Sequence, residues 1–278
     1  MCIVCVSAKN DDDHKSLRGL RRLTVEECDS ITSVPVIEGL QILNIWRCNS
    51  LTSVPVIEGL QKLDISYCNL ITSVPVIKGL QMLDIYSCDS ITSVPVIEGL
   101  QKLRIFNCQL FTSVPVIEGL KELHLYECDS ITSVPVIEGL QKLHVSYCNL
   151  ITSVPAIGGL EELHIWSCKS ITSVSVIEGF KELHISYCNS ITSATAIEGL
   201  RVLDVFSCKW LDISDIQRGS VLKLQQRMKQ KARLRMFKKY VRSREFCEWF
   251  YSPDEFGGQA SKRSIGSFIQ KVVDEQTR

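Results

Sequence analysis

Histidine is the residue whose spacing in this chain most directly suggests chemistry. Four of the five histidines recur every 20 residues, at His124, His144, His164 and His184. Neutral imidazole binds metal ions, and its pKa near 6.5 makes it the usual physiological pH switch. A regular column of histidines is therefore a candidate metal site, a candidate pH-sensitive surface or a simple stack of rings.

These three interpretations differ in what they require of the neighbouring groups. Rings on adjacent strands would stack about 4.8 Å apart, which repeated copying of one unit explains. A pH-sensitive surface would titrate below the ordinary pKa, since neighbouring rings cannot all be protonated without repulsion. Glu122, Glu162 or Glu182 could complete a metal site, but a flat column lacks a closed tetrahedral arrangement. We favour the stack, and therefore expect no metal and no cofactor.

The cysteines follow the same interval. Ten of the thirteen recur every 20 residues from Cys28 to Cys208. Thiols on successive strands would have parallel Cβ directions, which suits packing better than bridging. We expect a row of small buried side chains rather than a redox or metal site, and this favours a reducing compartment.

Nothing in the sequence indicates catalysis. Serine and histidine recur by repetition and do not converge on one point, as a nucleophile and its base would have to. The glycine that ends each unit is a lone turn residue and not part of a phosphate-binding loop. We therefore expect no catalytic residues, no enzyme activity and no small-molecule substrate.

The element that must position these columns is a 20-residue unit. It runs from Leu20 to about Leu211 and reads L-x-x-L-x-I/V-x-x-C-x-x-I-T-S-V-P-V-I-E-G. Alternation such as that of Leu63 and Ile65 with polar residues is typical of a short strand with one buried face. The T-S-V-P segment and the glycine favour an extended or turn-like return path, expected to be looser where Ser175 and Thr195 replace proline.

One unit cannot fold alone, because about seven buried side chains do not offset the ordering entropy of 20 residues. Stacked units supply the missing burial. The sequence therefore predicts a repeat solenoid, with one parallel sheet of about 10 to 11 short strands on its concave face and an extended or turn-like convex side.

Three regions follow along the chain. Residues 1–19 are expected to form a degenerate N-terminal capping rung, in which Leu17 takes the register of Ile37. Residues 20–216 form the solenoid of ten units, of which the last is degenerate. Residues 217–278 are expected to form a basic, helical C-terminal cap or tail, because apolar residues there recur at three- and four-residue steps.

The repeat L-x-x-L-x-I/V-x-x-C-x-x-I/L resembles the leucine-rich-repeat superfamily in its cysteine form, over about 190 residues. Its I-T-S-V-P portion, and the tail segment E-W-F-Y-S-P that begins at Glu248, are similar to leucine-rich-repeat proteins of giant amoeba-infecting DNA viruses. The resemblance implies a parallel-sheet horseshoe that binds other proteins. It does not supply the identity of the partner.

The exposed columns of the strand face contain one aromatic residue on every unit after the first. Aromatic side chains at a surface are typical interface anchors, because they bury a large area and keep a polar tip. An alternative is that the rings only cover the strand edges. We expect a protein-interaction scaffold whose unidentified protein partner binds the concave face. The candidate residues, with the four histidines, are Trp46, Tyr67, Tyr86, Phe106, Tyr126, Tyr147, Trp166, Tyr187 and Phe206.

Charge divides the chain unevenly and suggests a second function. Residues 1–216 contain 16 Lys and Arg against 25 Asp and Glu, whereas residues 217–244 contain 11 basic residues and no acidic one. This segment is either a cap with a solvated charged face or a binding site for nucleic acid or another anionic surface. The candidate anion-binding residues are Arg227, Lys229, Lys231, Arg233, Arg235, Lys238, Lys239, Arg242 and Arg244.

The location expected from the sequence is intracellular. The longest apolar runs are far shorter than the roughly 20 residues of a membrane span, and the apolar segment before Lys9 is too short for a signal peptide. We expect a cytoplasmic protein that is not secreted, in the host cytoplasm if the chain is viral.

Overall fold

A computed structural model describes residue 17 and residues 19–175, 181–191, 193–195, 201–206 and 208. The chain divides into two compact units, Met1–Gln217 and Arg218–Arg278. The second unit, with the expected helical segment, lies outside the described residues. None of the described segments is a helix with the length and apolar character that a membrane span requires.

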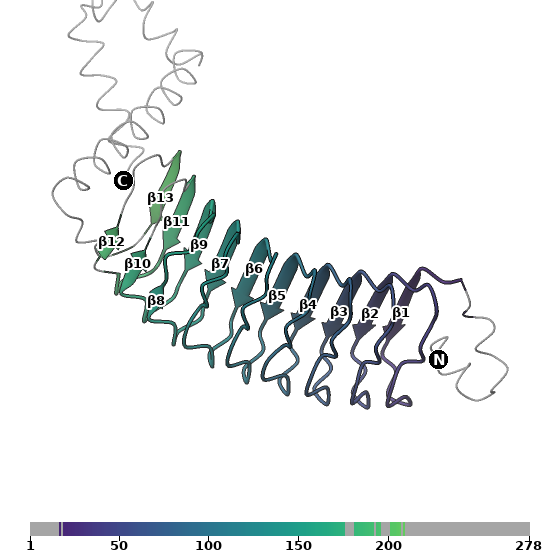
Figure 1. Ribbon diagram of the computed structural model, residues 1–278. Coiled ribbons are helices and arrows are strands. Elements are labelled where there is room, and N and C mark those ends of the chain that lie inside the picture. The colour runs from purple at the N-terminus through teal and green to yellow at the C-terminus, as the bar shows by residue number, and fades with distance from the viewer. Residues whose placement is uncertain are drawn as a thin grey trace, which may run out of the picture. The chain divides into compact units, whose positions relative to one another are not determined.

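The described part of the first unit is a stack of rungs, each of which contributes one five-residue strand to a single parallel sheet (Figure 1). Ten strands follow one another in chain order, as predicted. They are β1 (Arg22–Glu26), β2 (Ile42–Trp46), β3 (Lys62–Ser66), β4 (Met82–Tyr86), β5 (Lys102–Phe106), β6 (Glu122–Tyr126), β7 (Lys142–Ser146), β9 (Glu162–Trp166), β11 (Glu182–Ser186) and β13 (Val202–Phe206).

Strand pairing in the sheet follows the 20-residue period of the sequence. Leu63 in β3 pairs with Leu83 in β4, and every other pair in the sheet also joins residues 20 apart. The prediction that sequence columns become spatial rows is therefore confirmed. Figure 1 shows these strands side by side along a curve, with the ten-stranded sheet on its inner, concave side.

Each rung encloses the same small core. In the third rung Leu63 and Ile65 point inward from the strand, and the cysteine, isoleucine, valine, isoleucine and leucine that follow them are also buried. Because the neighbouring rungs repeat this set, the apolar side chains form continuous columns through the stack. The core of one rung is thus shielded from solvent by the rungs on either side of it, as expected for a repeat protein.

A left-handed residue follows each strand of the large sheet from β1 to β11. Tyr67 follows β3 with a φ of 56°, and its N–H donates to the carbonyl of Tyr86 on the next strand at 2.8 Å. The same conformation recurs in nine consecutive units, none with glycine at this position. This turn directs the next residue, the cysteine, into the core.

The return side contains a second sheet that the sequence analysis did not predict. β8 (Ser153–Val154), β10 (Ser173–Ser175) and β12 (Ser193–Thr195) form a three-stranded parallel sheet in which Ser175 pairs with Thr195, the two residues that replace proline. The looser packing expected of these units stays a prediction. Proline has no N–H to donate, so its replacement permits one more residue of strand pairing.

The glycine turn between units offers a direct test of backbone conformation. Gly99 has a φ of +88°, and a Cβ added there would meet no atom within 4 Å. We therefore expect Gly99→Ala to lower the free energy of unfolding by about 1 kcal/mol through backbone strain alone. Urea denaturation measures this loss. Glu98→Ala in the same turn is the matched control and should change stability by less than about 0.5 kcal/mol; an equal effect of both variants would contradict the strain argument.

Candidate functional site

The outward face of the ten-stranded sheet holds the columns that the sequence singled out. The polar positions of the strands alternate with the buried ones, and in β3 Lys62, Asp64 and Ser66 are all half-buried. Side chains on this face are therefore packed against their neighbours in the adjacent rungs, but keep one side open to solvent.

The four histidines form one continuous stack in the middle of this face. Ring centroids are 4.3 Å apart from His124 to His144, 4.1 Å from His144 to His164 and 4.3 Å from His164 to His184. The planes of adjacent rings lie within 13° of parallel. This is the stacked arrangement that we favoured from the sequence.

The stack favours neutral imidazoles. Burial, with the charges of the flanking His124 and His164, lowers the pKa of His144 to about 3. Burial, with Arg104 and Lys102, lowers the pKa of His124 to about 4. Burial also lowers the pKa of His164. These three rings are consequently uncharged at pH 7, the form in which imidazole binds a metal ion.

Ion pairs join neighbouring rungs on the same face. Lys142 Nζ lies 2.9 Å from Glu162 Oε2, and Lys102 contacts Glu122 in the same way. His184 Nδ1 lies 3.8 Å from a carboxylate oxygen of Asp204 at the end of the stack. These pairs balance the charge of the face locally, so the candidate surface is polar and ordered rather than strongly acidic or basic.

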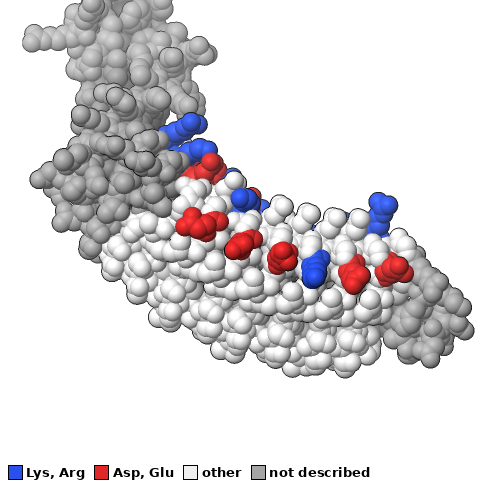
Figure 2. All heavy atoms as spheres, in the orientation of Figure 1, with Lys and Arg blue, Asp and Glu red and all other residues white. Residues whose placement is uncertain are grey.

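Another row of charges follows the turns at the ends of the units. Exposed side chains recur there every 20 residues, at Glu38, Glu58, Lys78, Glu98, Glu118 and Glu138. Figure 2 shows single charged side chains following one another in a line, with a broad surface almost free of charge beside it. The return side includes the exposed valines Val96, Val116 and Val136. It is thus a chemically different surface from the sheet face.

The nine predicted aromatic residues form one uninterrupted row along the stack. Adjacent ring centroids are between 5.1 and 6.5 Å apart wherever two rings stack or meet edge to face. Between Tyr147 and Trp166 the link is a hydrogen bond of 3.2 Å from the indole Nε1 to the phenol oxygen. Arg47 lies over the Trp46 ring at 4.3 Å.

The aromatic row combines two sequence positions. Six rings come from the last residue of a strand, and three come from the left-handed residue that follows it, namely Tyr67, Tyr147 and Tyr187. The three strands whose last residue is serine are the ones followed by tyrosine. Each rung after the first therefore supplies one ring, from either the last strand residue or the residue that follows it. Trp166, Tyr187 and Phe206 are 44%, 42% and 57% exposed, so the row is open to a partner.

The cysteine column is buried but does more than fill space. Cys88 Sγ lies 3.5 Å from the carbonyl oxygen of Ile65 in the preceding rung and 3.4 Å from that of Tyr86. Cys48, Cys128 and Cys168 repeat this pattern. The thiol is thus placed to donate to carbonyl groups at the strand ends, which periodicity alone does not reveal.

These thiols are not poised for redox chemistry. Burial raises the pKa of Cys88, Cys108 and Cys168 to about 12, so the reactive thiolate is suppressed. Within the described residues the eight cysteines from Cys68 to Cys208 are free thiols, as expected from the sequence. Cys28 departs from that expectation, because it is disulfide-bonded.

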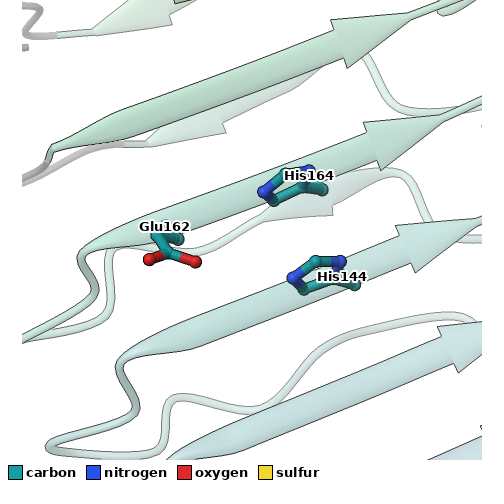
Figure 3. Close-up of side chains that lie close together, drawn as sticks. All are labelled: His144, Glu162 and His164. Atoms are coloured by element: carbon teal, nitrogen blue, oxygen red, sulfur yellow. The ribbon is translucent and has the colours of Figure 1, made fainter. Parts of the chain in front are cut away.

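One group of side chains on the sheet face could hold a metal ion. His144, Glu162 and His164 each offer a ligand atom, and these atoms lie within 4.8 Å of one another. Figure 3 shows both imidazoles with a ring nitrogen on the side of the Glu162 carboxylate. The sequence analysis placed Glu162 near the histidines but did not predict that its carboxylate lies close to two imidazole rings.

The second candidate site cannot be placed. All nine basic residues proposed for anion binding, from Arg227 to Arg244, lie outside the described residues. On the sheet face a shallow groove of about 380 Å³ follows the beginnings of the strands, and its lining includes Lys62, Met82 and Lys102. The sequence analysis did not identify this groove, because it depends on how long side chains fold over one another.

Comparison with known proteins adds one finding. A family model described as Leucine Rich Repeat matches residues 59–80, which begin at the glycine turn before β3 and end at the last buried leucine of that unit. No curated protein matches the chain. Since the other units repeat the matched one at the same register, the match describes the architecture of the whole stack.

Proposed function

Because the chain belongs to the leucine-rich-repeat superfamily, we propose that it is a scaffold that binds a protein partner on the concave face of its ten-stranded sheet. Such solenoids are generally protein-interaction scaffolds, and their curvature provides an extended concave surface. The superfamily is typically non-enzymatic. We propose the same for this protein.

The observation that carries this proposal is the continuous row of nine aromatic rings. Its rings are held by their neighbours in the stack, so a partner pays little ordering entropy when it covers them. Tyrosine and tryptophan also present a hydrogen-bonding tip to a partner. Interfaces concentrate their binding energy in such residues.

The proposal is tested by replacing three neighbouring rings, Tyr126, Tyr147 and Trp166, with alanine. Since truncation of an interface anchor costs about 2 kcal/mol or more and each 1.4 kcal/mol is tenfold, loss of three should weaken the partner's binding by roughly 10,000-fold. Proteins captured from a cell lysate by the wild-type chain are identified by quantitative mass spectrometry. The affinity of the purified partner is then measured for both chains.

The matched control replaces Val96, Val116 and Val136, which are exposed on the return side, with alanine. This variant also loses three exposed apolar side chains, but from the opposite surface, and it should keep the partner. Retention of the partner by the aromatic variant, or its loss from the valine variant alone, would move the binding site away from the sheet face.

A further inference from the structure

We propose that His144, Glu162 and His164 form a binding site for one zinc ion on the sheet face. The ligand atoms of the three residues lie within 4.8 Å of one another, and both imidazoles present a ring nitrogen on the side of the carboxylate (Figure 3). It is the one group of three metal-binding side chains with this proximity within the described part of the chain. The inference does not depend on whether a protein partner binds the aromatic row.

The donor set suits zinc. Two imidazole nitrogens and one carboxylate oxygen bind Zn²⁺ at about 2.0–2.2 Å, which places the ligand atoms of a tetrahedral ion roughly 3.3 Å apart. The three side chains are half-buried, so small rotations about their side-chain bonds close the remaining distance. A zinc ion with three protein ligands keeps a fourth position for water or for a side chain of a bound protein.

The stacked geometry sets how the imidazoles must move to bind the metal. Adjacent rings of His144 and His164 have centroids 4.1 Å apart and planes within 7° of parallel. Because an imidazole nitrogen presents its lone pair in the plane of its ring, the two rings must tilt toward each other by rotation about their side-chain bonds before both bind one ion. Their lowered pKa values keep both rings neutral at pH 7, so binding does not have to displace a ring proton.

One residue opposes the metal. Lys142 lies on the same strand as His144, and its Nζ is 2.9 Å from both carboxylate oxygens of Glu162. The ammonium group must leave the carboxylate before zinc can bind there, and it repels the ion while it stays close. The geometry therefore predicts that Lys142 limits the affinity and that its removal strengthens binding.

The two ends of the histidine stack are less suitable. The rung before His124 places Arg104 in the histidine column, and this positive charge lies beside the ring. His184 Nε2 lies 3.9 Å from a carboxylate oxygen of Glu182, and His184 Nδ1 lies 3.8 Å from a carboxylate oxygen of Asp204. His184 is therefore a useful control, because it belongs to the same stack but not to the proposed ligand set.

The test uses the full chain, freed of metal with a chelator and titrated with ZnCl₂ by isothermal calorimetry at pH 7. The double variant His144→Gln/His164→Gln loses two ligands and should bind zinc at least about 100-fold more weakly. His184→Gln should stay within about threefold of the wild type. Lys142→Met should bind zinc about tenfold more tightly, because the competing charge is gone.

A second measurement needs no variant. The imidazole NMR signals of His144 and His164 should shift on zinc addition before those of His124 and His184. Equal zinc affinity of the wild type and the double variant, or zinc-induced shifts confined to the other histidines, would overturn the proposal. Circular dichroism of each variant establishes that the solenoid has kept its fold.

Discussion

Deleting one whole unit, Gln81–Leu100, is expected to leave a folded solenoid with one strand fewer. The deletion joins Leu80 to Gln101 and makes β5 the neighbour of β3 in the same register, because all pairs of the sheet join residues 20 apart. Asp64 would then face Arg104, an oppositely charged pair. We expect a cooperative transition whose melting temperature falls by roughly 5 °C, since each rung contributes mainly through its neighbours.

The matched variant deletes only half a unit, Ile91–Leu100. It keeps the strand β4 but removes the segment that returns the chain from the turn after Cys88 to the start of β5. The rung cannot close, and its core loses the buried residues of the return side. We expect a loss of at least about 15 °C in melting temperature, or no cooperative transition at all.

Circular dichroism during heating separates the two deletions. The whole-unit variant should keep the shape of the wild-type far-UV spectrum, and the half-unit variant should lose strand signal. Similar melting of both variants would contradict the stacking of residues 20 apart. Everything inferred about the sheet face would then lose its geometric basis.

Much of this architecture could be predicted because it depends on burial. Leu63 and Ile65 alternate with polar residues in a pattern that only a strand with one buried face explains, and both are fully buried. The period then fixed which residues share a column, so the stacked histidines and the aromatic row could be expected before any distance was known. Side chains line up in a column whenever the strands pair in the correct register, and the 20-residue repeat specifies that register.

Features that depend on local backbone geometry could not be predicted. Nothing in the sequence marks Tyr67 as left-handed, because a tyrosine there is unusual and the repeat contains no glycine at that position. The second sheet of β8, β10 and β12 was missed because absence of proline was interpreted as loss of rigidity. The residues that replace proline also restore a backbone N–H, and Ser175 pairs with Thr195.

Features of the candidate site that depend on side-chain conformation were equally out of reach. The sequence showed that Glu162 lies near the histidine column, but a carboxylate on the neighbouring position could pair with a lysine, a histidine or water. Its contact with Lys142 and its proximity to both His144 and His164 follow from the packing of this particular rung. The identity of the partner could not be predicted either, because the residues of the sheet face do not specify which protein binds there.

Phe111 is expected to be the most sensitive core position of the central rungs. It is fully buried where the adjacent rungs have Ile91 and Ile131, and it is the largest fully buried side chain among the described residues. Phe111→Ala should lower the free energy of unfolding by about 3–5 kcal/mol, through lost burial and the cavity left behind. Guanidinium denaturation monitored by circular dichroism measures this loss.

Phe111→Ile separates the cavity from the loss of apolar surface. It restores the residue that the neighbouring rungs have, so the column regains its regular repeat with a smaller deficit in volume. We expect a loss of about 1 kcal/mol, because the adjacent side chains can close most of the remaining space. If Phe111→Ala also costs only about 1 kcal/mol, the rung collapses around the missing ring, and the core is more deformable than its columns of identical side chains indicate.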